Sequence, residues 1–447
     1  MNQTKFLEFR AEYPEFYYKG YDINELVDKY EFIFHFSIPN LSDFNPRILI
    51  EKETIINTNK EYIDYLVFHI GLVELISYWK CTCSPTVIIE AGDLDEKQIN
   101  WFLKLYYNGL GEFFYLNGID IPIDEFMTIK CNGTNSSLLD INYTGTGNLI
   151  AIGGGKDSTV SLELLAGMDN TCFMINPKDP GIECIKAAGY NTYLKIERYL
   201  DKSLLDLNSK GFLNGHTPFS ALVAFVSYLS AYLTNKKYIV LSNEGSANES
   251  TILGTSINHQ YSKTYEFEND FNDYSKKYFK LNIHYFSFLR CLSEFQIGML
   301  FSRYKKYHHI FKSCNVGSKS VPWKWCCKCP KCLFVYIILS PFIPKEEIIS
   351  IFGEDMYENE YLLSTFIELL GYGETKPFEC VGTYSEVRYA VSLVINSSEK
   401  LPYLLKYFKD NYSLELDVDY RKEFNEQNNI DSEFLDIIKE ELSKYAK

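Results

Sequence analysis

Residues 148–165 read NLIAIGGGKDSTVSLELL, and this stretch decides the fold of its region. The apolar run at residues 149–152 predicts a buried strand, three glycines follow it, and the spaced apolar residues after Ser158 predict a helix. A strand that turns into a helix through bare glycines presents backbone amides at the helix N-terminus, where the helix dipole favours an anion. The stretch therefore predicts a phosphate-binding turn in an α/β fold.

The hexapeptide GGGKDS (residues 153–158) differs from two familiar phosphate-binding loops. A Walker A loop needs Ser or Thr after its lysine and a glycine five positions before the second glycine, but here Asp157 follows Lys156 and the earlier position is Ile150. No G-x-G-x-x-G dinucleotide fingerprint falls at the turn. A ligand-free turn is the simple alternative, although it needs one or two glycines rather than three followed by a charged pair.

The side chains of this loop fit a triphosphate. Lys156 supplies a positive charge and Ser158 a hydroxyl donor, while the glycines let a phosphate approach the main chain. Asp157 would repel phosphate unless a cation lies between them, which indicates Mg²⁺. We therefore expect phosphate contacts from Gly153, Gly154, Gly155, Lys156 and Ser158, and a magnesium contact from Asp157.

GGGKDS resembles the PP-loop of the ATP pyrophosphatase superfamily, whose usual form is SGGxDS. The resemblance implies cleavage of ATP between the α and β phosphates, with release of pyrophosphate and adenylation of a substrate oxygen. Gly153 stands where the superfamily usually has Ser, which removes one hydroxyl from the loop but keeps the backbone amides.

Length and patterning predict more than one domain. The chain has 447 residues, 46% hydrophobic and 23% charged, enough for a full core in two or three domains. Strand-like and helix-like runs alternate up to about residue 143, strands alternate with helices after residue 149, and the spacing from residue 333 is mostly helical. We expect an N-terminal α+β domain (1–143), a PP-loop domain with a parallel sheet covered by helices on both faces (144–335), and a helical C-terminal region (336–447).

Charge and the N-terminal sequence bear on partners and compartment. The net charge of -15 argues against a general nucleic-acid or anionic-membrane binder. The first residues, MNQTKFLEFRAEYPEF, contain no apolar signal-peptide core, and the longest apolar stretch is too short for a membrane span. We expect a cytoplasmic protein with no membrane partner, in which clustered cysteines are metal ligands rather than disulfides.

Five cysteines gather in the stretch FKSCNVGSKSVPWKWCCKCPKC (residues 311–332). The spacing Cys326-x2-Cys329-x2-Cys332 brings three thiolates within reach of one ion, and Cys314 can return as the fourth ligand. Four sulfurs favour a structural Zn²⁺ site, with an iron–sulfur cluster as the rival. Cys327 is left as a spare or alternative ligand.

The same region is purely basic. No acidic residue lies between Glu294 and Lys345, although the rest of the chain is acidic. A solvated face is the ordinary explanation, but a long basic segment in such a chain also indicates an anion-binding surface. The basic residues are Arg303, Lys305, Lys306, Lys312, Lys319, Lys324, Lys328 and Lys331.

Six further stretches, in order along the chain, resemble the MurL family of UDP-N-acetylmuramoyl-L-alanyl-L-glutamate epimerases. They are NGHTPF (214–219), SNEGSANES (242–250), NHQYSKTYEFE (258–268), FSFLRCLSEFQI (286–297), WCCKCPKCLFV (325–335) and KPFECVG (376–382). The family's loop also typically reads GGGKDS, whereas Cys327 departs from the small residue expected there. The resemblance implies that ATP and Mg²⁺ convert the terminal L-Glu of UDP-MurNAc-L-Ala-L-Glu to D-Glu through an acyl-adenylate, in peptidoglycan precursor synthesis.

These stretches supply further candidate site residues. Thr217 as N-cap and Pro218 at the first helical position predict a helix start, and His216 just before them faces the nucleotide or supports the loop. Asn243 and Glu244 follow a predicted strand, where α/β folds place ligand groups, with a loop cap as the alternative.

Inversion needs a proton taken from one face of Cα and one delivered to the other. We favour His259, whose ordinary pKa suits proton transfer near neutral pH, and Cys380, since cysteine pairs serve cofactor-free racemases. Each candidate has a structural alternative, such as a buried hydrogen-bonding residue or a loop partner. The remaining candidates in the same stretches are Lys263, Glu266 and Glu379.

Three other functions stay open from the sequence. A 7-cyano-7-deazaguanine synthase or related carboxylate-activating enzyme also pairs a PP-loop with cysteine-bound zinc. A tRNA-modifying PP-loop enzyme suits the basic segment but not the net charge. A non-catalytic ATP-binding sensor would bind nucleotide without releasing pyrophosphate.

Overall fold

The computed structural model describes residues 2–133, 141–248, 258–373, 376–413 and 418–445. These residues form two compact units, each assembled from separate stretches of the chain. The first unit contains residues 1–149, 194–239 and 257–285, and the second contains 150–193, 240–256 and 286–447. The boundaries 1–143, 144–335 and 336–447 stay a prediction, because compactness alone does not define domains.

A mixed sheet organises the first unit. Its strand order is β9-β4-β2-β1-β5-β6, with β3 paired to β2. The pairs β1–β2, β2–β4 and β4–β9 are antiparallel, whereas β1–β5 and β5–β6 are parallel. The strands are β1 (Glu15–Glu25), β2 (Lys29–Ile38), β3 (Ser42–Phe44), β4 (Arg47–Glu51), β5 (Thr86–Ile89), β6 (Thr128–Cys131) and β9 (Leu194–Tyr199).

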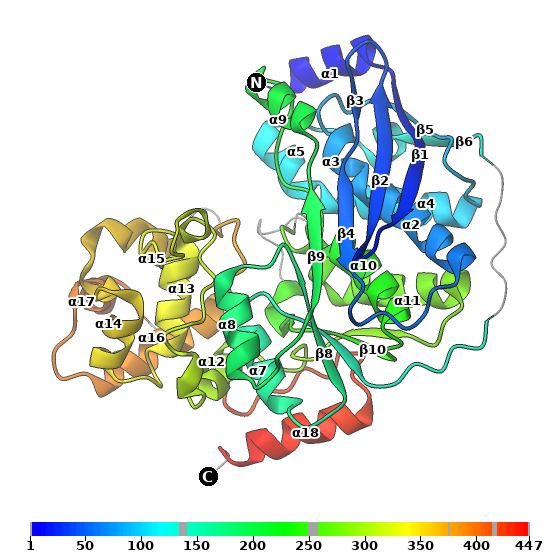
Figure 1. The fold of residues 1–447 in the computed structure, drawn as a ribbon. Helices are drawn as coiled ribbons and strands as arrows, with labels where there is room; N and C mark the ends of the chain where they lie inside the picture. The colour runs from blue at the N-terminus through cyan, green and yellow to red at the C-terminus, as the bar shows by residue number, and fades with distance from the viewer. Residues whose placement is uncertain (1, 134–140, 249–257, 374–375, 414–417, 446–447) are drawn as a thin grey trace. The chain divides into compact units, whose positions relative to one another are not determined.

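Strand β2 shows why the sheet packs on one face. Every second side chain along it is buried, beginning at Tyr30 and continuing through Phe32 and Phe34. A period of two places these aromatic rings on one face of the sheet, where they join the core. Figure 1 shows β1, β2 and β4 side by side.

Helices cover this sheet and build the rest of the first unit. α2 packs against β1 and α10, and Leu75 separates α2 from the short helix α3 that follows it. α10 begins at Phe219 with Pro218 as its N-cap and no side-chain cap, one residue later than predicted, since the sequence predicts Thr217 as N-cap and Pro218 as the first helical residue. The helices are α1 (Asn2–Glu12), α2 (Lys60–Glu74), α3 (Ile76–Trp79), α4 (Glu96–Gly109), α5 (Gly111–Asn117), α6 (Ile123–Phe126), α9 (Lys202–Ser209), α10 (Phe219–Leu233) and α11 (Tyr265–Tyr274).

Four strands in the order β11-β10-β7-β8 organise the second unit. They are β7 (Asn148–Ala151), β8 (Asn170–Ile175), β10 (Tyr238–Leu241) and β11 (His284–Ser287), and all but β8 begin in the first unit's stretches. β10 and β11 run parallel, since two hydrogen bonds, His284 N to Lys237 O at 2.9 Å and Phe288 N to Leu241 O at 2.8 Å, keep the same register. β10 is buried at every position, as parallel strands usually are.

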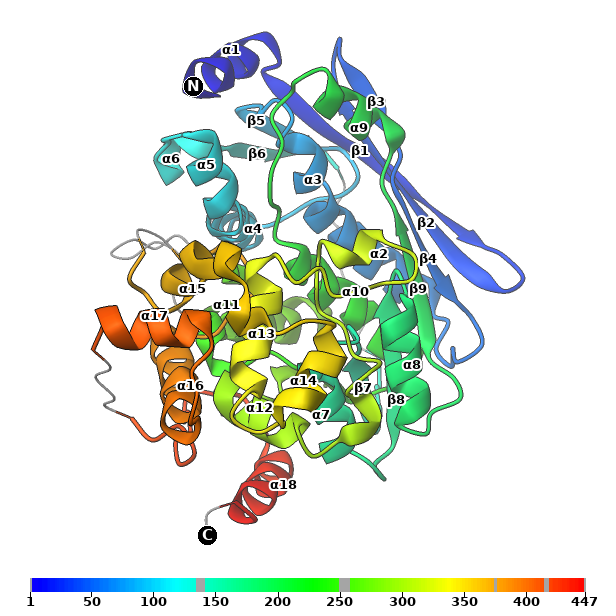
Figure 2. The same ribbon diagram turned by 90° about the vertical axis from the view of Figure 1, so that its left-hand side faces the viewer.

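Among the described residues after Ser287, all regular elements are helical, as the apolar spacing predicts for the C-terminal region. α12 packs on α7 and α13, and α13 packs on α14, α15 and α16 (Figure 2). The helices are α7 (Lys156–Leu164), α8 (Asp179–Ala187), α12 (Glu294–Phe301), α13 (Pro330–Leu339), α14 (Lys345–Phe352), α15 (Leu363–Leu369), α16 (Tyr384–Ser397), α17 (Tyr403–Asn411) and α18 (Ser432–Ser443). The α/β class is confirmed, whereas the PP-loop fold as such stays a prediction.

Among the same described residues, no helix has both the length and the apolar character that crossing a bilayer requires.

Candidate functional site

The strand-to-helix turn at GGGKDS forms as the sequence predicts, with β7 leading through the glycines into α7. Gly154 has φ +84°, and a Cβ there would come within 2.6 Å of the Gly181 nitrogen, so only glycine fits. A Cβ on Gly153 would meet nothing within 4 Å, which leaves its backbone open to an approaching group. Gly155 caps α7 without any side-chain hydrogen bond, so the amides at this helix start fit an anion.

Lys156, the first residue of α7, is buried rather than exposed. Its side chain is 1% accessible and its ammonium contacts the carboxylates of Asp157 and Glu294. Burial acts to lower the pKa of Lys156, but Asp157 and Glu294 outweigh it and raise that pKa above its usual range. Lys156 therefore carries a firm positive charge at the base of the loop.

Glu294 is a site residue that the sequence analysis missed. It is the first residue of α12 and is fully buried. Burial raises the pKa of its carboxyl to about 8 against the attraction of Lys156, with Asp157 and Glu244 adding to the rise. Burial therefore opposes ionisation of Glu294, and Asp157 competes with it for the one lysine. Its position in the apolar sequence EFQIGMLF was the available signal, because a carboxyl among buried residues needs a partner.

The stretch KPFECVG leads into a second buried carboxyl beside Glu294. Glu386 in α16 accepts hydrogen bonds from the backbone amides of Glu294 at 2.7 Å and Thr383 at 2.6 Å. Thr383 and Glu386 form the capping box of α16. The start of α12, which carries Glu294, is therefore fixed by the start of α16.

Asn243 and Glu244 lie just after β10, as predicted, and are tied to the FSFLRCLSEFQI stretch. The Asn243 amide donates to the Ser287 hydroxyl at 3.0 Å. Arg290, fully buried, donates to the same hydroxyl at 3.0 Å and to the Glu244 carbonyl at 3.1 Å. Arg290 is another residue missed from sequence, and its role here is to hold the loop that carries Glu244.

A pocket of about 210 Å³ lies among these segments of the second unit. Its lining includes Gly245, Ser293, Thr383 and Glu386, so two of the family-like stretches, 242–250 and 286–297, meet the start of α16 around one hollow. Ser158 is nearly buried, and its hydroxyl donates to the Gly155 carbonyl at 3.1 Å.

The basic segment reaches the glycine loop. The Lys312 backbone amide donates to the Gly154 carbonyl at 2.9 Å. Lys331 is buried and its ammonium contacts the Cys380 carbonyl, whereas Lys306 is half-exposed and pairs with Glu163 at 2.8 Å. The segment is therefore not simply a solvated face.

The four cysteines of the predicted metal site come together. The Sγ atoms of Cys314, Cys326, Cys329 and Cys332 all lie within 4.8 Å of one another. The Cys314–Cys329 and Cys326–Cys332 sulfurs are 3.8 and 3.7 Å apart. A tetrahedral zinc with Zn–S bonds of about 2.3 Å has sulfur–sulfur edges of about 3.8 Å, so the donor set fits such an ion.

Cys327 does not join this cluster. Its φ is +52°, in the left-handed region, and its thiol donates to the Phe352 carbonyl at 3.3 Å. The residue thus turns the chain between two candidate ligands and points its sulfur toward the end of α14.

In the first unit, two predicted residues meet a third that the sequence analysis missed. His259 Nδ1 hydrogen-bonds to the Glu112 carboxylate in α5, and His216 Nδ1 lies 3.4 Å from the same oxygen. The two imidazole rings are 4.6 Å apart, centre to centre. His216 and His259 therefore share one carboxylate, although His216 is predicted at the nucleotide.

The other proton-transfer candidates have simpler surroundings. Lys263 donates to Gln260 at 3.4 Å, and Glu266 is 58% exposed and pairs with Lys104 at 2.6 Å. In the second unit, Glu379 accepts from Asn315 at 2.8 Å at the surface, and Cys380 is half-buried. His259 and Cys380 belong to different units, so these contacts do not bring them together.

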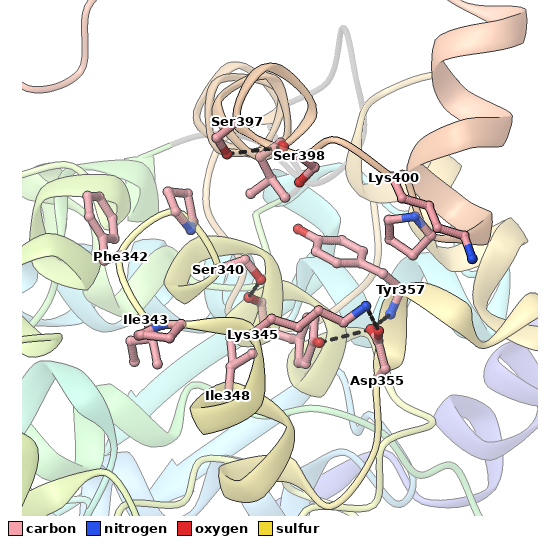
Figure 3. A pocket seen from close by; sticks show the side chains of 15 residues that line it. Ser340, Phe342, Ile343, Lys345, Ile348, Asp355, Tyr357, Ser397, Ser398 and Lys400 are labelled. Carbon is pink, nitrogen blue, oxygen red and sulfur yellow. Dashed lines mark hydrogen bonds and ion pairs between the residues drawn. The ribbon is translucent and has the colours of Figure 1, made fainter.

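A further pocket of about 340 Å³ lies among the C-terminal helices of the second unit. Its wall includes Tyr336 at the end of α13, Lys345 at the start of α14, and Ser397 at the end of α16. Figure 3 shows Lys345 reaching Asp355, with which it pairs at 2.8 Å. No predicted site residue lines this pocket.

Comparisons with known proteins agree with the motif series. The MurL N-terminal domain matches residues 8–288, and the MurL C-terminal domain matches residues 310–413. The chain belongs to the MurL family. It is 35% identical over 341 residues to a UDP-N-acetyl-alpha-D-muramoyl-L-alanyl-L-glutamate epimerase of Xanthomonas oryzae pv. oryzae, covering 73% of this chain and 74% of that protein.

Two further relatives carry the same name. The protein of Micromonospora sp. is 34% identical over 72% of this chain and 73% of its own length. That of Salinispora tropica is 35% identical over 71% of this chain and 70% of its own length. The two MurL domains divide the candidate residues: the glycine loop and both histidines fall in the N-terminal match, and the four clustered cysteines and Cys380 fall in the C-terminal match.

Proposed function

We propose that this chain converts the terminal L-Glu of UDP-MurNAc-L-Ala-L-Glu to D-Glu through an acyl-adenylate, releasing AMP and pyrophosphate. Membership of the MurL family and the names of the relatives support the substrate and the epimerisation. The observation that carries the use of ATP is the glycine turn, where bare amides at the start of α7 adjoin the charged, buried Lys156. We place the reaction in the cytoplasm, in the synthesis of peptidoglycan precursors.

Activation by ATP answers a chemical difficulty. The Cα–H of a free carboxylate is a very weak acid, because its removal would build a second negative charge beside the first. Adenylation removes the first charge and makes the carbonyl electron-withdrawing. A side-chain base can then take the proton, a second group can return one to the other face, and hydrolysis of the adenylate releases the inverted product.

The loop residues divide the binding of a triphosphate among them. The amides of Gly153, Gly154 and Gly155, with the ammonium of Lys156 and the hydroxyl of Ser158, hold the phosphates. Asp157 is 27% exposed, so its carboxylate is accessible to Mg²⁺, which would neutralise charge between it and the phosphates. Asn243, Glu244 and His216 remain the proposed nucleotide contacts beyond the loop.

For proton transfer we retain His259 and Cys380 as the favoured groups. The carboxylate of Glu112 stabilises an imidazolium at His259, which suits a base that gains a proton. Glu266 and Glu379 are less suited, because Glu266 is bound in a surface ion pair and Glu379 accepts an exposed hydrogen bond. Lys263 stays a candidate for a phosphate contact as well as for a base.

The four clustered cysteines we assign to structural Zn²⁺. Four thiolates fill a tetrahedral site and leave no open position for a substrate, so the ion would stabilise the stretch between α12 and α13.

The test is chiral amino-acid analysis after incubation with ATP, Mg²⁺ and UDP-MurNAc-L-Ala-L-Glu. We expect D-Glu, AMP and pyrophosphate in matched amounts, and none of them when ATP is omitted. Pyrophosphate release without D-Glu would indicate another carboxylate-activating or tRNA-modifying enzyme. Nucleotide binding without pyrophosphate release would indicate a sensor. Either result would contradict the proposal.

A further inference from the structure

Three titratable side chains from distant parts of the chain meet in the first unit. Glu112 belongs to the first turn of α5, His216 to the segment before α10, and His259 to the segment before α11. Their side chains are 11%, 26% and 16% exposed, so the cluster is recessed but accessible. Both imidazoles present Nδ1 to one oxygen of Glu112.

The surroundings of this cluster keep one imidazole neutral. Burial first, and then the charges of His259, Lys80 and Lys263, together lower the pKa of His216 to about 4 against the pull of Glu112. His216 is therefore uncharged at neutral pH. A single carboxylate thus faces a neutral imidazole, His216, at 3.4 Å and contacts the second imidazole, His259, more closely.

We propose that Glu112 is the positioning residue for His259, an inference that rests on the proposed epimerisation. A carboxylate that accepts from Nδ1 fixes the imidazole tautomer with its basic lone pair on Nε2, and stabilises the imidazolium that forms. In the proton-transfer step, Nε2 of His259 takes the Cα proton of the adenylated glutamate. The electron pair of the broken C–H bond passes to the carbonyl oxygen as an enolate, and a second group protonates the other face.

The same three side chains also have the composition of a cation site, since two imidazoles and one carboxylate can ligate a divalent ion. Lys80 and Lys263 oppose the binding of a cation, because their positive charges act on the imidazole of His216, which would be one of its ligands. We therefore favour the proton-transfer arrangement and make metal binding an outcome of the test.

The experiment compares the full-length protein with its Glu112→Gln and Glu112→Asp variants. Pyrophosphate exchange into ATP reports adenylation, and deuterium uptake at Cα reports proton transfer. For Glu112→Gln we expect normal pyrophosphate exchange, a fall in kcat for inversion of about 10²-fold or more, and an acid limb of the kcat–pH profile moved to lower pH. Glu112→Asp, which keeps the charge, should restore part of kcat and return the limb toward its original place. Glu8→Gln, an exposed change in α1, is the matched control and should match the unaltered protein.

The outcomes separate this inference from the proposed function. If the unaltered protein gives no ATP-dependent inversion, the proposed function itself fails. If it does invert, but Glu112→Gln has an unchanged kcat and pH profile, Glu112 does not position a base. Metal analysis adds the second contradiction: one divalent ion per chain beyond the cysteine site, lost in Glu112→Gln, would make the cluster a metal centre instead. Should Glu112→Gln fail to fold, His259→Gln gives the second test, since an unchanged kcat for inversion in that variant would show that His259 is not a base for Glu112 to position.

Discussion

Replacing Glu294 with Gln tests the electrostatics beneath the glycine loop. If Glu294 is protonated in the folded protein, Gln is a close neutral substitute, and Glu294→Gln should change the free energy of unfolding by less than about 1 kcal/mol at pH 4.5, before the unfolded carboxyl is fully ionised. If Glu294 is instead the ionised partner of Lys156, its removal breaks a buried ion pair and costs about 3–5 kcal/mol. The side chain is 1% exposed, so solvent screening does not blur the contrast.

The pH dependence gives the magnitude. A carboxyl with pKa about 8 in the folded protein and 4.5 in the unfolded chain binds more protons when folded, so its contribution to stability is complete below pH 4.5 and is lost as pH rises to 8. A shift of that size corresponds to roughly 4–5 kcal/mol at about 1.4 kcal/mol per unit. The unaltered protein should therefore lose stability relative to Glu294→Gln across this window.

Urea unfolding followed by tryptophan fluorescence suits the measurement, because Trp323 and Trp325 belong to the second unit. Lys306→Gln, which removes a half-exposed ion pair in the same unit, is the control and should cost less than about 1 kcal/mol at every pH. A loss of about 3 kcal/mol or more for Glu294→Gln at both pH 5 and pH 8 would refute a protonated Glu294.

Three further predictions concern the loop, the metal and a buried histidine. Asp157→Asn should keep the fold yet abolish pyrophosphate release, because the magnesium contact is lost. A coupled phosphate assay measures the release, and near-normal turnover would rule out a magnesium contact at Asp157. Elemental analysis should find about one zinc per chain. Cys329→Ser or Cys332→Ser should lower both the zinc content and the stability of the protein. Iron and sulfide in the purified protein would contradict the zinc assignment. Burial lowers the pKa of His69 to about 4, so folding should weaken as pH falls from 6.5 to 4, by roughly 3 kcal/mol; a His69→Asn variant with the same acid slope in urea titrations would contradict this.

The sequence predicted the two parts of the site whose residues lie close together in the chain, the glycine turn and the cysteine cluster. The glycine turn follows from a strand, three glycines and a helix within a few residues, and Gly154 confirms it through its positive φ. The cysteine cluster follows from the spacing of Cys326, Cys329 and Cys332, with Cys314 a short distance before them in the chain. In both cases the residues that must meet are near neighbours, so little depends on the rest of the fold.

The sequence did not predict contacts between residues that lie far apart in the chain. Lys156 meets Glu294 across 138 positions, and His259 meets Glu112 across 147. Which carboxyl contacts which basic side chain depends on how the strands and helices pack. No local sequence pattern shows that packing. Helix limits are also hard to predict to the residue: α10 starts after Pro218, one residue later than the capping preference of Thr217 predicts.

The most direct test of the central claim is deuterium uptake at the glutamyl Cα. The protein is incubated in deuterated water with UDP-MurNAc-L-Ala-L-Glu, ATP and Mg²⁺, and the recovered glutamate is examined by chiral chromatography with mass spectrometry. Adenylate-assisted inversion predicts that each D-Glu carries one deuterium at Cα, and that no deuterium enters when ATP is omitted or Asp157 is replaced by Asn. Inversion without ATP, or D-Glu that keeps its original Cα hydrogen, would contradict it.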